Sequence, residues 1–476
     1  MHEILNISVS QRSNHLTTQF FNCQEALLYS SDGNINDNSV FLKPTIDRLS
    51  KTVSYSPRAL LWDAKTGNGS LGTHQYAETK DYYEFEGNAS HPGNSIMMTH
   101  PRIEKSEYQR ALDSGTQLPL LNSSNTKYWS DYSRLIYPPS SFNSLTDWYH
   151  DVDNPNTPDY ENLGQRKFDN YNIGFNEFNE NYCMAFFDDN LHQQLEQSDS
   201  LQGFNLIADM DNGWGGFSTA LLQELKNELP KSTVFTWGFN EDDPLTASTV
   251  RDQRITRMNL PFITNKLKAS INLLQESDLL FPIYSSPIMT NWEVSGMVCK
   301  VFDSVNSVFS QNNLEQRKSM NHFVNYITNG DDSKNIVSNI IDEENPKLKY
   351  SFYPRVIPFK NKREEVYEFS HCTITRCMDR DDPKSRTDKT DINEIKTYSY
   401  FPADTIPEQF SKSKDFKLRL SSTEACRDVY KHWHEIVSKY FKNDPDREEL
   451  KEQLSSVASS YEFGWYDDDD SGDDDY

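Results

Sequence analysis

The sequence lacks any run of about 18 or more apolar residues, the length that indicates a membrane-spanning helix. Its opening residues, 1–9, contain no basic leader, no long apolar core and no Arg-rich amphipathic pattern. We therefore expect no membrane insertion and no signal or transit peptide in this opening segment.

Cysteine is scarce, with six residues in a chain of 476. The six are scattered and include no Cys-x-x-Cys pair, which predicts reduced thiols in a reducing compartment rather than a disulfide framework. His371, Cys372 and Cys377 lie close together in the sequence, but their spacing matches no common zinc pattern. We therefore expect no metal site, and the simpler interpretation of these cysteines is burial in strands.

Positive charge is also scarce, because 47 Lys and Arg residues face 72 Asp and Glu residues and leave a net charge of −25. A field of this sign repels nucleic-acid phosphates and anionic lipid headgroups. We expect no direct nucleic-acid partner, and basic or chaperone-like proteins fit better. The last ten residues alone hold seven Asp. Residues 465–476 are predicted to form a disordered, solvated tail, which either keeps the protein soluble or recruits basic partners.

Common catalytic signatures are missing as well. The sequence contains no Gly-x-Ser-x-Gly elbow, no His-Glu-x-x-His pair and no intact P-loop. Acidic pairs such as Asp188-Asp189 and Asp331-Asp332 are typical of solvated loops. The sequence therefore predicts no catalytic residue.

The chain is rich in aromatic residues, which make up 13% of it. Each buried ring removes a large area from water, so a sizeable core is expected even though hydrophobic residues make up only 36% of the chain. At about 150 residues per domain, the length predicts two to four domains.

Strand-like and helix-like segments alternate through much of the first 290 residues. Apolar residues recur with period two in 3–9, and Leu16, Phe20, Cys23 and Leu27 follow at helical spacing. This alternation predicts a doubly wound α/β domain with a parallel sheet. We assign 1–73 and 126–290 to that domain and 74–125 to a polar, partly disordered insertion. Further strands are predicted at 58–63, 204–210, 233–237 and 279–284, and helices at 182–197 and 218–229.

The pattern changes after residue 290. A helix near 318–327 and strand-like segments around 350–359 and 366–376 predict a second domain of α+β type over 291–419. Residues 420–464 are predicted to be helical. Within them, Ser421 and Glu424 suggest a capping box and Asp444-Pro445 suggests the start of the last helix.

Several short segments resemble tubulins in the order in which tubulins carry them. Residues 1–14 resemble the first strand and phosphate loop, and residues 55–63 resemble the strand before the magnesium-associated loop. Residues 201–206 resemble the strand before the signature loop, and Gly213-Trp-Gly-Gly216 lies where that loop belongs.

The resemblance continues at the carboxyl end and narrows to one family. Residues 420–425 and 446–461 are similar to late tubulin helices, and the acidic tail ends in Tyr476. The long insertion after the second strand and the block Trp129-Ser-Asp-Tyr132 resemble the Misato family of divergent tubulin/FtsZ-like proteins. The resemblance implies a Rossmann-type parallel sheet, then a smaller α+β domain and C-terminal helices.

The same resemblance implies a function. It predicts a non-enzymatic protein that takes part in the inheritance of mitochondria and mitochondrial DNA, and in mitochondrial distribution and morphology. The implied location is the cytoplasm and the outer surface of mitochondria. The implied partners are the cytosolic chaperonin that folds tubulin, tubulin itself and mitochondrial surface proteins.

The resemblance also implies the position of a nucleotide site, but the residues at that position are poorly suited to bind a nucleotide. Amides at a helix N-terminus bind phosphate only where glycines let it approach, yet Ser10, Ser13 and Thr17 stand at glycine positions of the first loop. Lys65 replaces an expected acidic residue, and Trp214 replaces a phosphate-contacting Thr. The vestigial site comprises Gln11, Asn14, Asp63, Lys65, Gly67, Gly213, Gly215, Gly216 and Ser218.

Further substitutions weaken the site. Asp211 adds negative charge near the phosphates, and Ser285 stands where the guanine base would meet Asn. Tubulin-like GTPases complete the site with an acidic loop from the next subunit, but 328–333 has no following Glu. We expect no bound cofactor, although weak GTP binding stays open because Lys65 can replace the metal as a counter-charge.

Simpler interpretations stand beside this site. The glycines of the signature turn can serve only to allow a tight turn, Asn14 to cap the first helix and Asp63 to cap the end of its strand. Two other functions also stay open: an active, filament-forming GTPase, and a tubulin-folding or spindle accessory factor that works with the chaperonin.

Overall fold

The computed structural model describes most of the chain between residues 3 and 464. The described residues are 3–30, 35–46, 51–71, 103–151, 153–154, 157–161, 166–241, 260–285, 288–342, 366–377, 393–442 and 444–464. The expected strand at 350–359, much of the insertion and the acidic tail lie outside these ranges. No helix in the described ranges is both long and apolar enough to cross a membrane.

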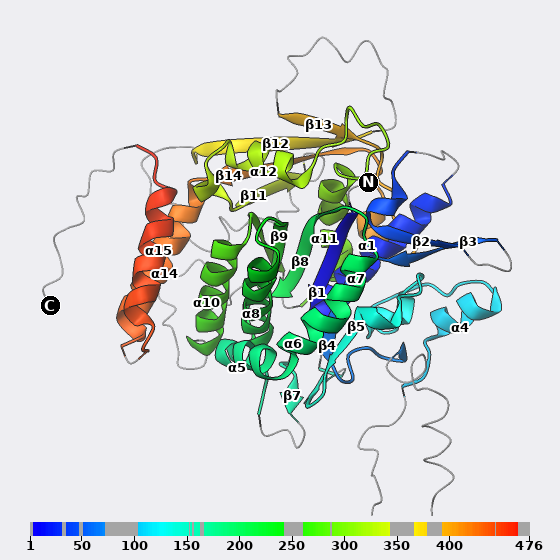
Figure 1. Ribbon diagram of the computed structural model, residues 1–476, viewed down its shortest axis with the longest axis horizontal. Helices are drawn as coiled ribbons and strands as arrows, with labels where there is room; N and C mark the ends of the chain where they lie inside the picture. The colour runs from blue at the N-terminus through cyan, green and yellow to red at the C-terminus, as the bar shows by residue number, and fades with distance from the viewer. Residues whose placement is uncertain are drawn as a thin grey trace, which may run out of the picture.

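A six-stranded parallel sheet forms the centre of the molecule (Figure 1). Its strand order is β10-β9-β8-β1-β4-β5, so strands are added on both sides of β1. Both faces of the sheet are buried, so successive residues along a strand are buried even where they are polar, as at Asn6 and Ser8. The strands are β1 (Glu3–Val9), β4 (Ala59–Ala64), β5 (Phe142–Leu145), β8 (Leu201–Asp209), β9 (Thr233–Glu241) and β10 (Leu279–Ser285).

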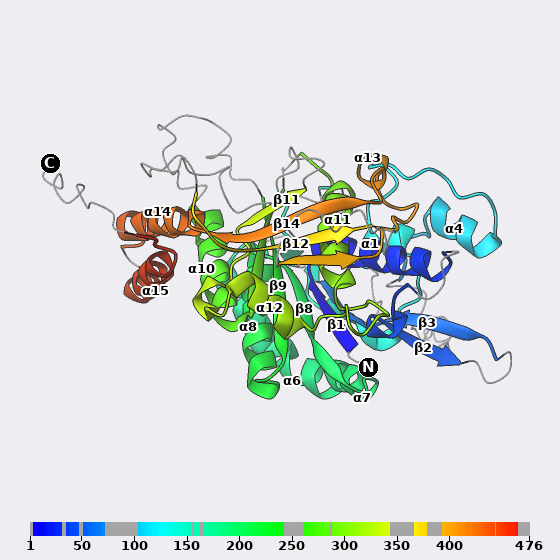
Figure 2. The ribbon, with the colours of Figure 1, turned by 90° about the horizontal axis from the view of Figure 1, so that it is seen from above.

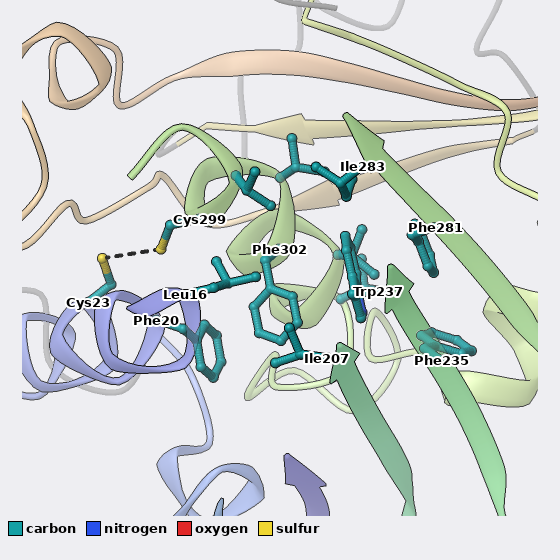
Figure 3. Packing of buried hydrophobic residues seen from close by; sticks show 14 of the residues in the cluster. Leu16, Phe20, Cys23, Ile207, Phe235, Trp237, Phe281, Ile283, Cys299 and Phe302 are labelled. Atoms are coloured by element: carbon teal, nitrogen blue, oxygen red, sulfur yellow. Dashed lines mark hydrogen bonds between the residues drawn. The ribbon is translucent and has the colours of Figure 1, made fainter. Parts of the chain in front are cut away.

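Helices cover the two faces and enclose two cores. On one face, the indole of Trp237 stacks on Phe281 with ring centroids 4.0 Å apart, and Phe302 packs edge-on against it (Figure 3). On the other face, Trp62 packs against Phe217. The first core involves α1 (Gln11–Leu28) and α11 (Asn291–Ser307), and the second involves α5 (Tyr171–Glu177), α8 (Gly213–Glu228) and α10 (Leu260–Glu276).

One helical segment differs from its prediction. The helix expected at 182–197 begins eleven residues earlier, at Tyr171, and winds irregularly to Glu196. Two π-helical turns interrupt it. The pieces are α5, η4 (Phe178–Tyr182), α6 (Cys183–Ala185), η5 (Phe186–Leu191) and α7 (His192–Glu196).

The chain between β1 and β8 adds small elements around this sheet. Part of the predicted insertion is ordered, because α4 (Glu107–Ser114) is capped by Ser106 and ended by Gly115 in a left-handed conformation. Its Tyr108 is buried and donates a hydrogen bond to Asp404. The other elements are η1 (Asn38–Val40), the hairpin β2 (Leu42–Ile46) and β3 (Val53–Pro57), η2 (Trp129–Tyr132), η3 (Pro139–Ser141), β6 (Trp148–Tyr149) and β7 (Tyr160–Glu161).

A second, mixed sheet lies across one end of the first (Figure 1). Two buried ion pairs join it to α11: Lys300 Nζ lies 2.6 Å from Asp342 Oδ2, and Arg376 Nη2 lies 2.9 Å from Asp303 Oδ2. Its strands are β11 (Asn339–Asp342), β14 (Phe416–Thr423), β12 (Glu368–Arg376) and β13 (Glu394–Thr397), in that order. The short elements α12 (Met320–Thr328), η6 (Asp332–Lys334) and α13 (Glu408–Ser411) accompany it.

Two C-terminal helices pack against α10, at the opposite end of the molecule from the β2–β3 hairpin (Figure 2). They are α14 (Ala425–Tyr440) and α15 (Arg447–Ser460). The capping box predicted for the first was wrong: Ser421 belongs to β14, where pairing with β12 and β11 engages its backbone, and Glu424 precedes α14 without a side-chain cap. The last helix begins at Arg447 rather than at Pro445.

Candidate functional site

The expected ligand crevice lies at the carboxyl ends of β1 and β8. In doubly wound sheets, ligands bind where strand order reverses, and here the reversal falls between these two strands. Helices α1 and α8 begin directly beyond them. Their N-termini would offer backbone amides to a phosphate group.

Side chains of the protein itself already accept hydrogen bonds from amides at both helix N-termini. Ser10 Oγ accepts a hydrogen bond from the amide of Ser13 at 3.2 Å, and Asn212 Oδ1 accepts one from the amide of Trp214 at 2.9 Å. Ser10 has φ 116° and ψ 161°, a conformation that is normally confined to glycine. The loop thus keeps a backbone shape suited to glycine and fills it with a capping hydroxyl.

Arg12 closes the crevice from the first turn of α1. Its Nε lies 2.9 Å from Asp209 Oδ1, its Nη2 lies 3.4 Å from Asp211 Oδ1 and its Nη1 lies 3.5 Å from Ser285 Oγ. Asp211 also accepts a hydrogen bond of 2.8 Å from the amide of Glu241. Arg12 therefore links the ends of β8 and β10, and its partner Asp211 links them to the end of β9.

This network contains more carboxyl groups than cationic groups. Burial lowers the pKa of Arg12, but Asp209, Asp211 and Glu241 outweigh burial and raise it. Burial, assisted by Asp211, raises the pKa of Asp209 to about 6 against the opposing effect of Arg12. Three carboxyl groups face the guanidinium of Arg12, and Lys266 also acts on Glu241, so the carboxyl groups outnumber the cations and a polyphosphate would meet net repulsion here.

The predicted residues Gln11, Asn14, Asp63 and Gly67 do come together, in a second buried cluster. Asn14 Nδ2 donates to Asp63 Oδ2 at 2.9 Å, and Trp129 Nε1 donates to the same oxygen at 3.1 Å. The amide nitrogen of Gln11, when it faces these acceptors, donates to Asp63 Oδ2 at 2.5 Å and to Gly67 O at 3.1 Å.

Both carboxylate oxygens of Asp63 accept hydrogen bonds from groups within the protein. Its other oxygen accepts from the amide of Ala64 at 2.9 Å, and a Cβ on Gly67 would lie 1.9 Å from that oxygen. Burial raises the pKa of Asp63 to about 7. Elsewhere too, no group of three or more His, Cys, Asp or Glu side chains within the described ranges is arranged to hold a metal ion.

Glycines of the signature turn pack helices against one another. A Cβ on Gly216 would lie 1.8 Å from Tyr171 O, and one on Gly213 would lie 2.7 Å from the ring of Phe168. A Cβ on Gly215 would lie 2.9 Å from Ala269 on α10. These contacts support the simpler interpretation, in which the glycines allow close approach of neighbouring elements. Ser218, one turn later, is completely buried.

Trp214 fills the space beside this turn. The indole is almost completely buried and donates from Nε1 to Asp159 Oδ2 at 2.7 Å. The other oxygen of Asp159 lies 2.8 Å from His150 Nδ1. Lys65 does not join these groups, because its side chain is exposed and Nζ lies 5.5 Å from the ring centre of Tyr149.

Sequence reasoning missed four residues of this region: Arg12, Trp129, His150 and Asp159. Arg12 carried a usable signal, since it is the cation within the predicted phosphate loop, 10–14, while Asp209 ends β8 and Asp211 follows it. His150 and Asp159 carried none, because they lie in the acidic segment 146–170, whose pattern is typical of a loop.

Comparison with known proteins agrees with this fold. A Misato segment II tubulin-like domain matches residues 2–114, and a tubulin domain matches residues 118–309. Protein DML1 of Kluyveromyces lactis is 48% identical over 99% of both chains, and Protein DML1 of Eremothecium gossypii is 43% identical over the full length of both. A more distant Protein DML1, from Coccidioides immitis, is 24% identical over the full length of both chains. The chain therefore belongs to the Misato/DML1 family of proteins with tubulin-like domains.

Proposed function

We propose that this chain is a non-enzymatic tubulin-like protein that acts in the inheritance of mitochondria and mitochondrial DNA. In this proposal the tubulin fold serves as a rigid scaffold for protein partners, without a nucleotide cycle. The single observation that carries the proposal is the closed crevice, where Arg12 is bound to Asp209 and Asp211.

Energetics support the absence of a nucleotide cycle. A bound triphosphate would have to separate Arg12 from its carboxylates and displace the caps of two helices. Breaking a buried ion pair costs about 3–5 kcal/mol, and each lost cap costs about 1 kcal/mol. Even if the freed Arg12 then paired with the phosphates, Asp209 and Asp211 would be left buried without their cation.

Family membership supports the cellular part of the proposal. Misato-type resemblance implies distribution and morphology of mitochondria, a cytoplasmic pool and attachment at the mitochondrial outer surface. The proposed partners are the cytosolic chaperonin, tubulin and mitochondrial surface proteins. The net charge of −25 favours protein partners over nucleic acid, so the link to mitochondrial DNA would be indirect.

The proposal is tested by depleting the protein in its own cells and following mitochondria and mitochondrial DNA through division. We expect daughter cells that lack one or both, and rescue by the wild-type chain. Lys65→Ala should rescue equally, because this exposed side chain is the candidate counter-charge for a phosphate. Normal partition after depletion would contradict the mitochondrial role. A folded Lys65→Ala protein that fails to rescue would contradict the non-enzymatic role.

A further inference from the structure

An open groove lies between the end of α8 and the irregular helix that runs from η5 into α7. Its volume is about 370 Å³. Phe187, Leu191, Leu195 and Leu229 form an apolar floor, and the charged residues of the lining, here called the rim, are Asp188 and Glu228. His192 also lines the groove, and its Nδ1 lies 3.8 Å from Glu196 Oε1. We call this feature the acidic groove. It is separate from the closed crevice at the ends of β1 and β8.

Three of the four floor residues are partly accessible, and Leu191 is buried. The π-helical turn η5 contributes Phe187 and Leu191, and turns of this kind are often found at functional sites. Phe187, Leu195 and Leu229 are only half-buried. Next to the groove in the chain, the side chain of Met184 is 79% exposed. Apolar surface is thus available inside the groove.

Negative charge surrounds the apolar floor. Asp188 and Glu228 form no ion pair with any side chain in the described part of the chain, and neither Lys nor Arg lines the groove. Burial raises the pKa of the half-buried Cys183 thiol, and the charges of Glu224, Asp188 and Glu228 raise it further. The nearby Lys226 is engaged by Asp278, 2.8 Å away.

We propose that the acidic groove binds a basic segment of a partner protein that carries a bulky aliphatic or aromatic anchor. The anchor would cover Phe187 and Leu195, and Lys or Arg side chains flanking it would pair with Asp188 and Glu228. This charge pattern disfavours the other occupants: anionic lipid, nucleic acid and a second copy of this chain, with its net charge of −25, are all repelled.

The test uses the full-length protein and a fluorescent amphipathic peptide of lysine and leucine, with binding followed by anisotropy. Asp188→Lys combined with Glu228→Lys reverses the charge of the rim. Glu315→Lys combined with Glu452→Lys is the matched control, since it changes net charge equally at exposed positions elsewhere. Leu195→Gln tests the floor, and circular dichroism checks that each variant is folded.

We expect the rim variant to weaken binding about tenfold or more, and the control variant to weaken it less than about twofold. Leu195→Gln should weaken binding severalfold, and a peptide with serine in place of leucine should bind poorly. Equal weakening by the rim and control variants would show attraction by net charge alone and would overturn the proposal. So would the absence of saturable binding, or equal binding of the serine peptide.

Discussion

At the scale of single residues, the crevice is closed by a few side chains that stand where a nucleotide site needs open space. Ser10 and Asn212 cap the two helices, and Arg12 bridges Asp209 and Asp211. The substitution of loop glycines by side chains was predictable from the sequence. The partners of those side chains were not, because residues 12 and 209 meet only through the order of strands in the sheet.

Arg12→Met should destabilise the protein strongly. Removing the guanidinium leaves Asp209 and Asp211 buried beside Glu241 without their cation, so we expect a loss of about 3–5 kcal/mol in the free energy of unfolding at neutral pH. Urea denaturation measures it. Arg12→Lys keeps the charge and should lose less, and equal losses in the two variants would contradict the role assigned to charge.

The raised pKa of Asp63 predicts that the stability of the fold depends on pH. Its folded pKa of about 7 lies above its ordinary value of 3.8, so the folded state binds a proton more tightly than the unfolded state. This contribution to stability is present below about pH 4 and is lost as pH rises toward about 7. Asp63→Asn should remove that part of the pH profile, measured by urea denaturation at several pH values. Identical slopes for wild type and variant would contradict the shift.

At the scale of elements, sequence reasoning succeeded where apolar runs are long. β1, β4, β8, β9 and β10 were all expected near their observed positions. It failed where tertiary contact overrides local pattern. Helix α5 begins at Tyr171 with Asn170 as its cap, and Gly174 lets its backbone meet that of α8, where a Cβ on Gly174 would lie only 1.7 Å from Gly213 O. Helix α4 buries only Tyr108 and Ala111, too few positions to show a period.

The close contact between α5 and α8 predicts that a glycine substitution there costs more stability than one at an open position. Gly216→Ala places a methyl group against the backbone of Tyr171, so we expect about 3 kcal/mol of destabilisation or more. Gly330→Ala meets open space and strains only a left-handed residue, which costs about 1 kcal/mol. Thermal or urea unfolding of both variants compares them, and a smaller effect at Gly216 would contradict this packing.

At the scale of the whole molecule, α11 joins the two sheets into one hydrophobic core. Phe302 packs on Trp237 of the first sheet, while Asp303 and Lys300 pair with Arg376 and Asp342 of the second. That a second region with its own sheet follows the parallel sheet was predicted from the sequence. Their shared core was not, because the sequence does not reveal which face of α11 meets which sheet.

This shared core predicts that the first 290 residues do not fold alone. A fragment ending there lacks α11, so the face of the sheet that carries Ile207, Phe235 and Trp237 loses its cover. We expect that fragment to aggregate or to lack cooperative unfolding when followed by circular dichroism. Co-expression with residues 291–476 should restore a folded complex. A stable, cooperatively unfolding fragment would contradict this shared core.

The central claim is that the crevice between α1 and α8 is closed to nucleotide by the chain's own side chains. Isothermal titration of GTP, with magnesium, into the purified full-length protein tests it most directly, with tubulin depleted of nucleotide as the positive control. We predict no saturable heat for this chain at GTP concentrations that saturate tubulin. Saturable binding of GTP with micromolar or tighter affinity would contradict the claim.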